Sequence, residues 1–381
     1  MSSRCDRLDH ETIAAWLRET GPAELDRLWA RADAVRAAHV GDAVHLRGLI
    51  EISNHCVRDC LYCGIRAHSD GIVRYRMTAD GILSCAREAK RLGYGTVVMQ
   101  SGEDPGLTRD FVSGVIRAIK AETGLAVTLS LGERSDEELA AWKADGADRF
   151  LLRFETSDAS LYRRIHPSLP GTLSDRVAQL LRMRAMGYEI GSGVMVGVPG
   201  QTWDILARDV EMLRDLDMDM IGIGPFLPSA RTPLGGAAAE KLRASAFEQV
   251  PNDELTTLKV VALARLVCPE ANLPSTTALA TIDPATGREL GLTRGANVVM
   301  PNLTPPEYRV LYEIYPGKAC VHETAKACHG CLQGRIAAIG RHVGSGPGGR
   351  RRTAGQGSPS IIGIDATDVR ARSKPRGPAP S

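Results

Sequence analysis

The stretch HLRGLIEISNHCVRDCLYC, residues 45–63, joins an apolar segment to a loop that carries three cysteines. Residues 45–53 form a nearly continuous apolar run, which is typical of a strand covered on both faces in a parallel sheet. Cys56, Cys60 and Cys63 follow at C-x-x-x-C-x-x-C spacing, so their thiolates can converge on one small inorganic group. Three thiolates leave one iron of a four-iron cube open, and an open iron can bind a substrate.

Two other kinds of site are compatible with this loop. A closed zinc site needs four ligands, and His55 or His68 could supply the fourth. A thioredoxin-like redox pair would use Cys60 and Cys63 at a helix N-terminus after a strand. The spacing, with an aromatic residue directly before the last cysteine, resembles that of the radical S-adenosylmethionine (SAM) enzymes, which favours an iron–sulfur cluster.

Length and composition indicate a large folded protein. The chain has 381 residues, of which 43% are hydrophobic, so it can bury a large core. It has nine cysteines and a polar start without an apolar signal segment. No apolar run approaches the roughly 18 residues of a membrane span. We therefore expect a cytoplasmic protein that does not cross a membrane.

The charge is unevenly distributed along the chain. Residues 341–381 hold eight Lys or Arg and two Asp, which gives this segment +6 and the first 340 residues −4. A mildly acidic body gives no electrostatic basis for binding nucleic acid. The basic segment is rich in Gly, Pro, Ser and Arg. We therefore expect a disordered tail over 341–381, which either binds an acidic partner weakly or only aids solubility.

Short apolar segments alternate with amphipathic segments from Val44 onward. We expect strands at 45–53, 96–101, 126–131, 149–155, 190–197, 220–227, 272–278 and 296–301. Helical spacing of apolar residues predicts helices at 79–92, 109–123, 137–145, 173–186, 202–216 and 253–267. Eight such units over roughly 260 residues predict an α/β protein with a complete (β/α)8 TIM barrel. A doubly wound open sheet is the alternative, and it more often stops at fewer strands.

This interpretation divides the chain into four parts. We expect an N-terminal cap of two helices at 1–43, closing the bottom of the barrel, and the barrel itself at 44–303. A C-terminal extension at 304–340 carries a second cysteine motif, and the tail at 341–381 follows. In that motif, Cys320, Cys328 and Cys331 have C-x7-C-x-x-C spacing with histidines between them. Its chemistry fits a second iron–sulfur cluster, which we favour, or a zinc site completed by a histidine.

Polar residues occur where the predicted strands end. In a barrel of this kind the carboxyl ends of the strands meet at one rim, where functional side chains lie. Ser101 and Glu155 end two strands, and Arg176 lies near the start of a helix. Their groups can accept hydrogen bonds from an ammonium or a ribose, or pair with a carboxylate, as bound SAM would require. A polar residue at a strand end is also a common helix cap, and many on one rim favour a ligand site.

Blocks of sequence along the chain resemble the family of the FeFe-hydrogenase maturase HydE. This is a radical SAM family close to biotin synthase and methylornithine synthase. The resemblance extends from about Val44 to Cys331. Its blocks are LIEISN (49–54), YRMT (75–78), QSGEDP (100–105), VTLSLGE (127–133), VPGQT (198–202), GIGPF (222–226) and YPGK (315–318). They are far more specific than the cysteine motif, which the whole superfamily shares.

The resemblance implies a complete barrel with a SAM-binding 4Fe–4S cluster on Cys56, Cys60 and Cys63. The residues that it places around SAM are Gln100, Ser101, Glu155, Arg176 and Met195. The residues that it places at the substrate cavity are Arg47, Thr128, Arg153, Thr276, Thr277, Met300 and Tyr312, with Tyr315 nearby. A possible second cluster maps onto Cys320, Cys328 and Cys331. No catalytic side chain is assigned beyond the cluster and SAM.

The implied activity is reductive cleavage of SAM to methionine and a 5′-deoxyadenosyl radical. The implied substrate is a small organometallic compound, an iron–carbonyl–cyanide–cysteine precursor of the hydrogenase diiron subcluster. Companion hydrogenase maturation proteins and an electron donor would be its partners. Two alternatives stay open: a radical SAM mutase or synthase acting on a small metabolite, and a non-catalytic iron–sulfur scaffold. Phe154 departs from the family pattern, where histidine can stand, and residues 235–247 are expected to be a surface insertion.

Overall fold

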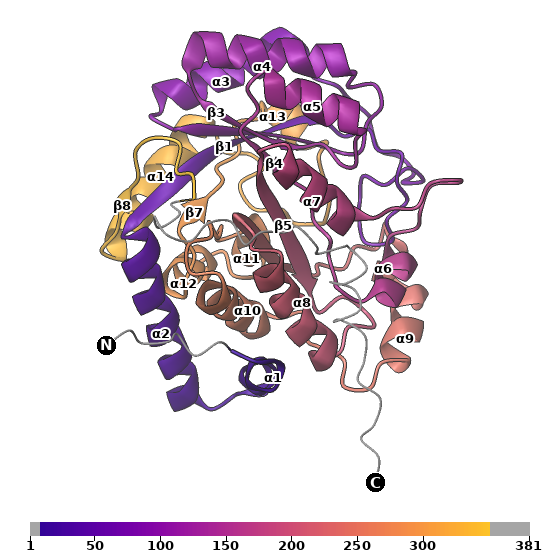
Figure 1. Ribbon diagram of the computed structural model, residues 1–381, viewed down its shortest axis with the longest axis vertical. Coiled ribbons are helices and arrows are strands. Elements are labelled where there is room, and N and C mark those ends of the chain that lie inside the picture. The colour runs from indigo at the N-terminus through magenta and orange to yellow at the C-terminus, as the bar shows by residue number, and fades with distance from the viewer. Residues whose placement is uncertain (1–7, 351–381) are drawn as a thin grey trace.

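A computed structural model describes residues 8–350 and shows a parallel sheet surrounded by helices (Figure 1). Its strands are β1 Ala43–Ser53, β2 Thr96–Ser101, β3 Ala126–Ser130, β4 Arg149–Leu151, β5 Glu189–Val196, β6 Met220–Pro225 and β7 Val298–Val299. They lie in the order β6-β5-β4-β3-β2-β1-β7, and every neighbouring pair is parallel. The predicted α/β class is confirmed, as a parallel half-barrel of seven strands.

Residues 272–274 connect the two edges of this sheet by isolated bridges. Met220 of β6 bridges to Asn272, and Pro274 bridges to Val298 of β7, both in parallel. The strand predicted at 272–278 is wrong at its end, because helix α11, Thr277–Ile282, begins there with Thr276 as its N-cap. Proline has no N–H to donate to a ladder, which limits regular pairing at Pro274.

The helices that follow the strands lie where the sequence predicts them, to within three residues. They are α3 Ala79–Arg91, α4 Arg109–Thr123, α5 Asp136–Ala144, α7 Arg176–Ala185, α8 Trp203–Asp215 and α10 Glu254–Val267. Each begins after a Ser, Thr or Asp whose side chain accepts a hydrogen bond from the first turn. At α5, Ser135 and Glu138 form a full capping box.

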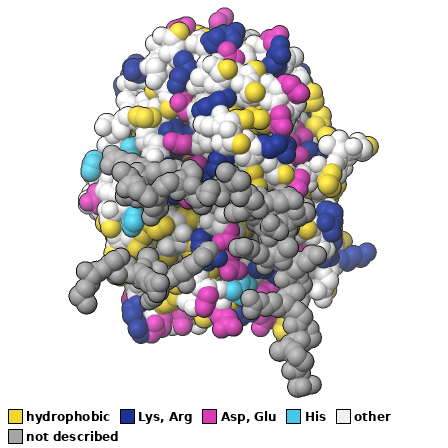
Figure 2. All heavy atoms as spheres, in the orientation of Figure 1, with side chains coloured by type: hydrophobic (Ala, Val, Ile, Leu, Met, Phe, Trp, Pro, Cys, Tyr) yellow, Lys and Arg dark blue, Asp and Glu magenta, His cyan; other side chains and the backbone are white. Residues whose placement is uncertain are grey.

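Further helices lie in the connections and near the C-terminus. They are α6 Ala159–Ile165, α9 Ala237–Ala244, α12 Gly287–Thr293, α13 Pro306–Arg309, α14 Ala325–Ala338 and the short 3-10 helix η1 Pro233–Gly235. The predicted surface insertion at 235–247 contains α9. No helix within residues 8–350 combines the length and apolar character of a membrane span. On the face shown in Figure 2, acidic and basic side chains are interspersed.

The two N-terminal helices pack on the outside of the molecule. α1, His10–Arg18, and α2, Pro22–Val40, contact α8 and α10 (Figure 1). Lys259 of α10 donates hydrogen bonds to the carbonyls of Leu17 and Glu19. This differs from the expected cap on the bottom of the barrel. The chain that crosses the amino ends of the strands is instead residues 344–350.

The predicted tail begins too early, because residues 341–350 are folded against the body. A short strand β8, His342–Val343, pairs with the start of β1. Arg341 donates to the carbonyl of Ala296 (3.1 Å) and pairs with Asp33. A Gly-rich composition suggests disorder, but glycine also permits a close backbone approach. The rest of the predicted tail, 351–381, lies outside the described residues, as do residues 1–7.

Candidate active site

A cavity of ≈ 320 Å³ lies inside the curved sheet and is lined by residues from all seven strands, β1 to β7. Inward-facing side chains of the strands form its walls. Cys63 of the cysteine loop and Lys318 of the C-terminal extension lie at its border. The predicted site residues that line it are Arg47, Gln100, Thr128, Arg153, Glu155, Met195, Thr276, Thr277, Met300 and Tyr315. The structure therefore brings together most of the residues that the resemblance grouped.

Three of the residues predicted to contact SAM or substrate lie outside the lining of this cavity. Tyr312 is buried beside it, and its hydroxyl accepts a hydrogen bond from Gln100 (3.2 Å). It lies three residues after the end of α13 at Arg309. Ser101 donates its hydroxyl proton to the carbonyl of Gly102 (2.6 Å). Arg176 is the third.

Arg176 is the first residue of α7, and its guanidinium contacts three neighbours. Its Nε–H donates to Glu133 (3.0 Å), and its Nη1 donates to the carbonyl of Arg153 (2.7 Å). Its Nη2 lies 2.6 Å from Nε2 of His166. Burial, with the charges of Arg176 and Arg58, lowers the pKa of His166 to about 2. The imidazole is therefore neutral, and its Nε2 accepts a hydrogen bond from Nη2 of Arg176.

The cysteine loop follows β1 directly, as predicted. Cys60 is buried, while Cys56 and Cys63 are partly exposed. Burial raises the pKa of Cys63 to about 12, and the charge of Cys56 adds to this effect. Within residues 8–350, no three Cys, His, Asp or Glu side chains are grouped closely enough to hold a metal ion. Three thiols on one short loop, with Cys63 at the cavity border, are nevertheless the donor set that an iron–sulfur cube with an open position takes.

Arg74, which is half-buried, and Gly102 fix this loop. Arg74 donates to the carbonyls of Ile65 (2.8 Å) and Arg66 (2.7 Å). Gly102 follows β2, and a Cβ there would lie 2.7 Å from the Cβ of Cys56. Gly102 therefore makes room for the loop. His68, one of the possible zinc ligands, is exposed and lies 3.3 Å from Asp59.

Glu155 lies in a strained turn that the sequence does not reveal. β4 ends at Leu151, although the apolar run made us expect a strand to Glu155. Glu155 has φ 62°, a left-handed conformation that costs a non-glycine residue free energy. Its N–H donates to the carbonyl of Gly193 (3.1 Å), and its carbonyl accepts from Met195 (3.2 Å). Its carboxylate, 3.1 Å from Nε of Arg153, is thereby presented to the cavity.

A buried carboxylate that the sequence analysis missed supports this turn. Asp209 of α8 accepts hydrogen bonds from the N–H (2.5 Å) and hydroxyl (2.6 Å) of Ser157. It also accepts from Thr156 (3.2 Å) and from Gln201 (2.9 Å), which follows β5. Burial raises the pKa of Asp209 to about 6. This side chain joins the loops that follow β4 and β5, and the cavity is lined by Glu155 of the first loop and by Met195 of β5.

Residues 50–213 match the radical SAM superfamily. The chain is 47% identical over 327 residues to the FeFe-hydrogenase maturase subunit HydE of Thermotoga maritima, covering 86% of this chain and 89% of that relative. The chain belongs to the HydE family. It is therefore a radical SAM enzyme, as the sequence predicted, and its family uses a 4Fe–4S cluster and SAM.

More distant relatives agree with this assignment. The HydE-family chain is 30% identical over 286 residues to 3-methylornithine synthase of Methanosarcina barkeri, covering 74% of this chain and 76% of that one. The crystal structure of methylornithine synthase (PylB) superposes with a TM-score of 0.74 at 24% identity. It covers 89% of this chain and 94% of that chain, which shows a shared fold.

This HydE-family cavity contains an ion pair to which the sequence analysis assigned no role. Glu51 of β1 is 1% exposed and pairs with Lys318 of the extension; both side chains line the cavity. Asn302 donates a further hydrogen bond to Glu51 (2.9 Å). Two signals pointed there: Glu51 is a carboxylate within an apolar run, and Lys318 ends the YPGK block.

The second cysteine motif begins before α14 and continues on that helix. Cys328 and Cys331 lie on α14, where Cys331 is exposed, and Cys320 precedes the helix with φ 61°. Hydrogen bonding to Cys328, with the charge of Arg288, lowers the pKa of Cys320 to about 6. His329 lies 3.2 Å from the hydroxyl of Tyr94. The structure therefore places two thiols in contact and the third one turn along the helix.

Proposed function

We propose that this chain cleaves SAM reductively and acts on an iron–carbonyl–cyanide–cysteine precursor during assembly of the FeFe-hydrogenase H-cluster. The observation that supports this most is the 47% identity to HydE over 86% of this chain and 89% of that relative. The name of that relative describes a maturase subunit, so companion maturation proteins are expected as partners. An electron donor is the other expected partner, and the expected compartment is the cytoplasm.

The barrel is proposed to be complete. Bridges at Asn272 and Pro274 join β6 to β7, so residues 272–274 would serve as the missing strand of a closed ring. A closed ring keeps water away from the cavity on all sides, which radical chemistry requires.

The cysteine loop is proposed to hold the cluster through Cys56, Cys60 and Cys63. When bound, the cluster supplies the electron that cleaves the sulfonium of SAM into methionine and a 5′-deoxyadenosyl radical. Gln100, Glu155 and Met195 line the cavity with Cys63 and would bind SAM, with Ser101 and Arg176 beside them. The carboxylate of Glu155 can accept hydrogen bonds from ribose hydroxyls. Cys320, Cys328 and Cys331 are proposed to hold the second cluster.

The deep end of the cavity is proposed to bind an anionic substrate. Arg47 is 3% exposed, and burial with the charge of Arg149 lowers its pKa to about 9, so it stays charged near neutral pH. Among the described residues, no carboxylate forms an ion pair with Arg47. Its Nε and the hydroxyl of Thr128 are buried without a hydrogen-bond partner. The other substrate-lining residues are proposed to be Arg153, Thr276, Thr277, Met300, Tyr312 and Tyr315.

A maturation assay tests this proposal. Apo-hydrogenase is combined anaerobically with the companion maturases and this chain as the only HydE, and hydrogen evolution is measured. The wild type should activate the hydrogenase, whereas Glu155→Ala and Arg176→Ala should not. Activation by both variants would support a scaffold without turnover. Absence of activation by the wild type would favour the second candidate, an enzyme that acts on a small metabolite. The 30% identity to 3-methylornithine synthase supports that candidate.

A further inference from the structure

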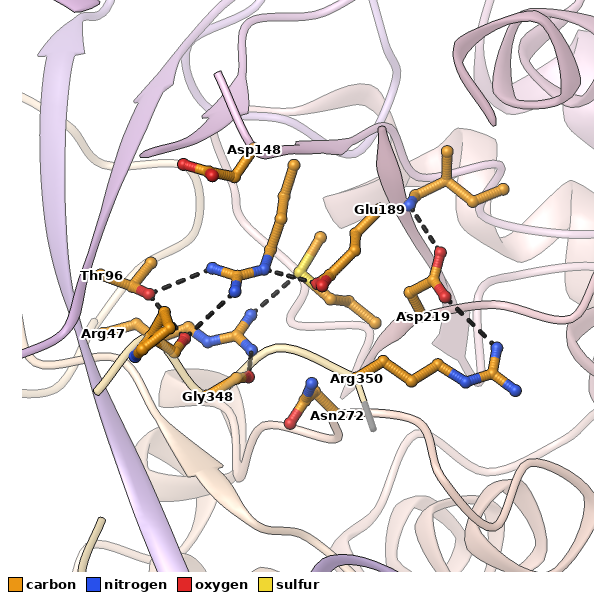
Figure 3. Close-up of polar contacts among 12 residues, drawn as sticks. Arg47, Thr96, Asp148, Glu189, Asp219, Asn272, Gly348 and Arg350 are labelled. Atoms are coloured by element: carbon orange, nitrogen blue, oxygen red, sulfur yellow. Dashed lines mark hydrogen bonds and ion pairs between the residues drawn. The ribbon is translucent and has the colours of Figure 1, made fainter. Parts of the chain in front are cut away.

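Residues 344–350, here called the floor segment, cross the amino ends of the strands and contact several of them (Figure 3). The carbonyl of Pro347 accepts hydrogen bonds from the hydroxyl of Thr96 (2.8 Å) and from Nη2 of Arg149 (3.1 Å). The carbonyl of Gly348 accepts one from Nη2 of Arg47 (2.8 Å). The floor segment therefore connects β1, β2 and β4 from below.

The side chains above the floor segment form the deep end of the cavity. Arg149, Glu189 and Met220 are the first residues of β4, β5 and β6. Arg149 donates to Glu189 (2.6 Å), and Arg47 donates to the sulfur of Met220 (2.9 Å) (Figure 3). Arg47, Met220 and Asn272 line the cavity, so this layer separates it from the floor segment.

Arg350 anchors the end of the floor segment near β6. Its Nη2 lies 2.7 Å from the carboxylate of Asp217 and 3.5 Å from that of Glu270. Its Nη1 lies 3.3 Å from the carboxylate of Asp219 and donates to the carbonyl of Asp217 (3.0 Å). Three carboxylates around one arginine whose side chain is 9% exposed make a firm attachment.

Glycines allow the floor segment to lie this close to the strands. A Cβ on Gly95, just before β2, would lie 1.8 Å from the carbonyl oxygen of Gly346. A Cβ on Gly348, which has φ +54°, would lie 2.5 Å from the ring of His45. Neither contact can be relieved without moving backbone or a packed ring. Glycine at these two positions therefore allows the floor segment to pack directly against the strands.

We infer that the floor segment is a positioning element of the substrate site, which orients Arg47 and closes the amino end of the cavity. A carboxylate partner would neutralise Arg47, whereas the carbonyl of Gly348 fixes one end of the guanidinium and leaves its charge available. Nε of Arg47 stays buried without a partner. The inference rests on the proposed function only in taking the cavity as the place where substrate binds.

Two substitutions in the full-length reconstituted enzyme test this inference. Gly95→Ala should displace Gly346, and Arg350→Gln should release the anchor. The matched controls are Gly114→Ala, where a Cβ meets open space, and Arg117→Gln, which removes an exposed ion pair with Asp145. KM for the iron precursor should rise roughly tenfold or more in the test variants with a smaller change in kcat, because Arg47 is misplaced. The controls should behave as wild type.

SAM cleavage without substrate separates positioning from general damage. Gln100 and Ser101 lie at the other end of β2 from Gly95, so this activity should stay unchanged. An equal loss of SAM cleavage and substrate turnover would overturn the inference, and so would an unchanged KM in both test variants.

Amide hydrogen exchange gives a readout that does not depend on the substrate. Exchange at residues 45–50 and 96–99 should be faster in both test variants than in the controls. If the wild type does not consume the iron precursor, the proposed function fails, and exchange alone decides the inference. Faster exchange then supports the floor segment as the closure of the cavity, and unchanged exchange overturns it.

Discussion

The carboxylate of Glu51 and the ammonium of Lys318 form an ion pair inside the cavity, which joins the middle of β1 to the C-terminal extension. Both side chains are almost fully buried, and the ring of Tyr312 lies 5.1 Å from the ammonium. The extension thus forms part of the cavity wall.

Removing the ammonium should destabilise the protein strongly. Lys318→Met leaves the Glu51 charge buried with only the hydrogen bond from Asn302, so the free energy of unfolding should fall by about 3 kcal/mol. Urea unfolding of the anaerobic protein measures this. The double variant Lys318→Met/Glu51→Gln removes the uncompensated charge and should be more stable than Lys318→Met alone. A double variant that is less stable than the single one would contradict a buried ionic pair.

Glu155 should separate backbone strain from function. Glu155→Ala should lower SAM cleavage by roughly 100-fold, because a polar contact to SAM is lost. Glu155→Gly should be equally inactive but more stable than Glu155→Ala by about 1 kcal/mol, since glycine adopts a positive φ without strain. The measurements are 5′-deoxyadenosine formation and thermal unfolding. Equal stability of the two variants would show that the left-handed turn is not maintained.

His166 should make stability depend on pH. Its folded pKa of about 2 lies below its ordinary value of 6.5, so the neutral ring stabilises the fold above pH 6.5. As the pH falls, the unfolded chain binds a proton that the folded chain does not, and about 1.4 kcal/mol is lost per pH unit. The stability difference between wild type and His166→Gln should therefore shrink by about 1.4 kcal/mol between roughly pH 7.5 and pH 5.5. A constant difference would mean that His166 has the same pKa in the folded and the unfolded chain.

The two cysteine groups should bind iron independently. Cys60→Ser should abolish SAM cleavage, while Cys328→Ser should lower the iron content of the reconstituted protein by about half and leave SAM cleavage in place. Iron analysis and visible absorbance check this. Zinc instead of iron in the Cys328 group after purification with both metals supplied would refute the second cluster.

The sequence predicts the scaffold well because its signals are local. Apolar runs such as 96–101, and helical spacing such as that over 109–123, lie within single elements, and the structure confirms them. The strand predicted at 149–155 is too long, because β4 ends at Leu151. Phe154 continues the apolar run, but the turn at Glu155 depends on hydrogen bonds with β5. The strand predicted at 272–278 is reduced to isolated bridges at Asn272 and Pro274, because proline donates no hydrogen bond and α11 begins at Thr277.

The site was predicted through resemblance, and contacts distant in sequence were missed. The pairing of Glu51 with Lys318 spans two ends of the chain, and Asp209 joins two loops from a helix. The position of 344–350 under Arg47 contradicted a composition rule, because a Gly-rich segment can pack tightly as well as be disordered.

Product analysis by mass spectrometry tests directly whether this protein cleaves SAM reductively. The protein is reconstituted anaerobically, reduced with dithionite and incubated with SAM, with and without the iron–carbonyl–cyanide–cysteine precursor. We expect 5′-deoxyadenosine or an adenosylated product, which forms faster when the precursor is present and does not form in Cys60→Ser. Failure to form either compound under both conditions would contradict it.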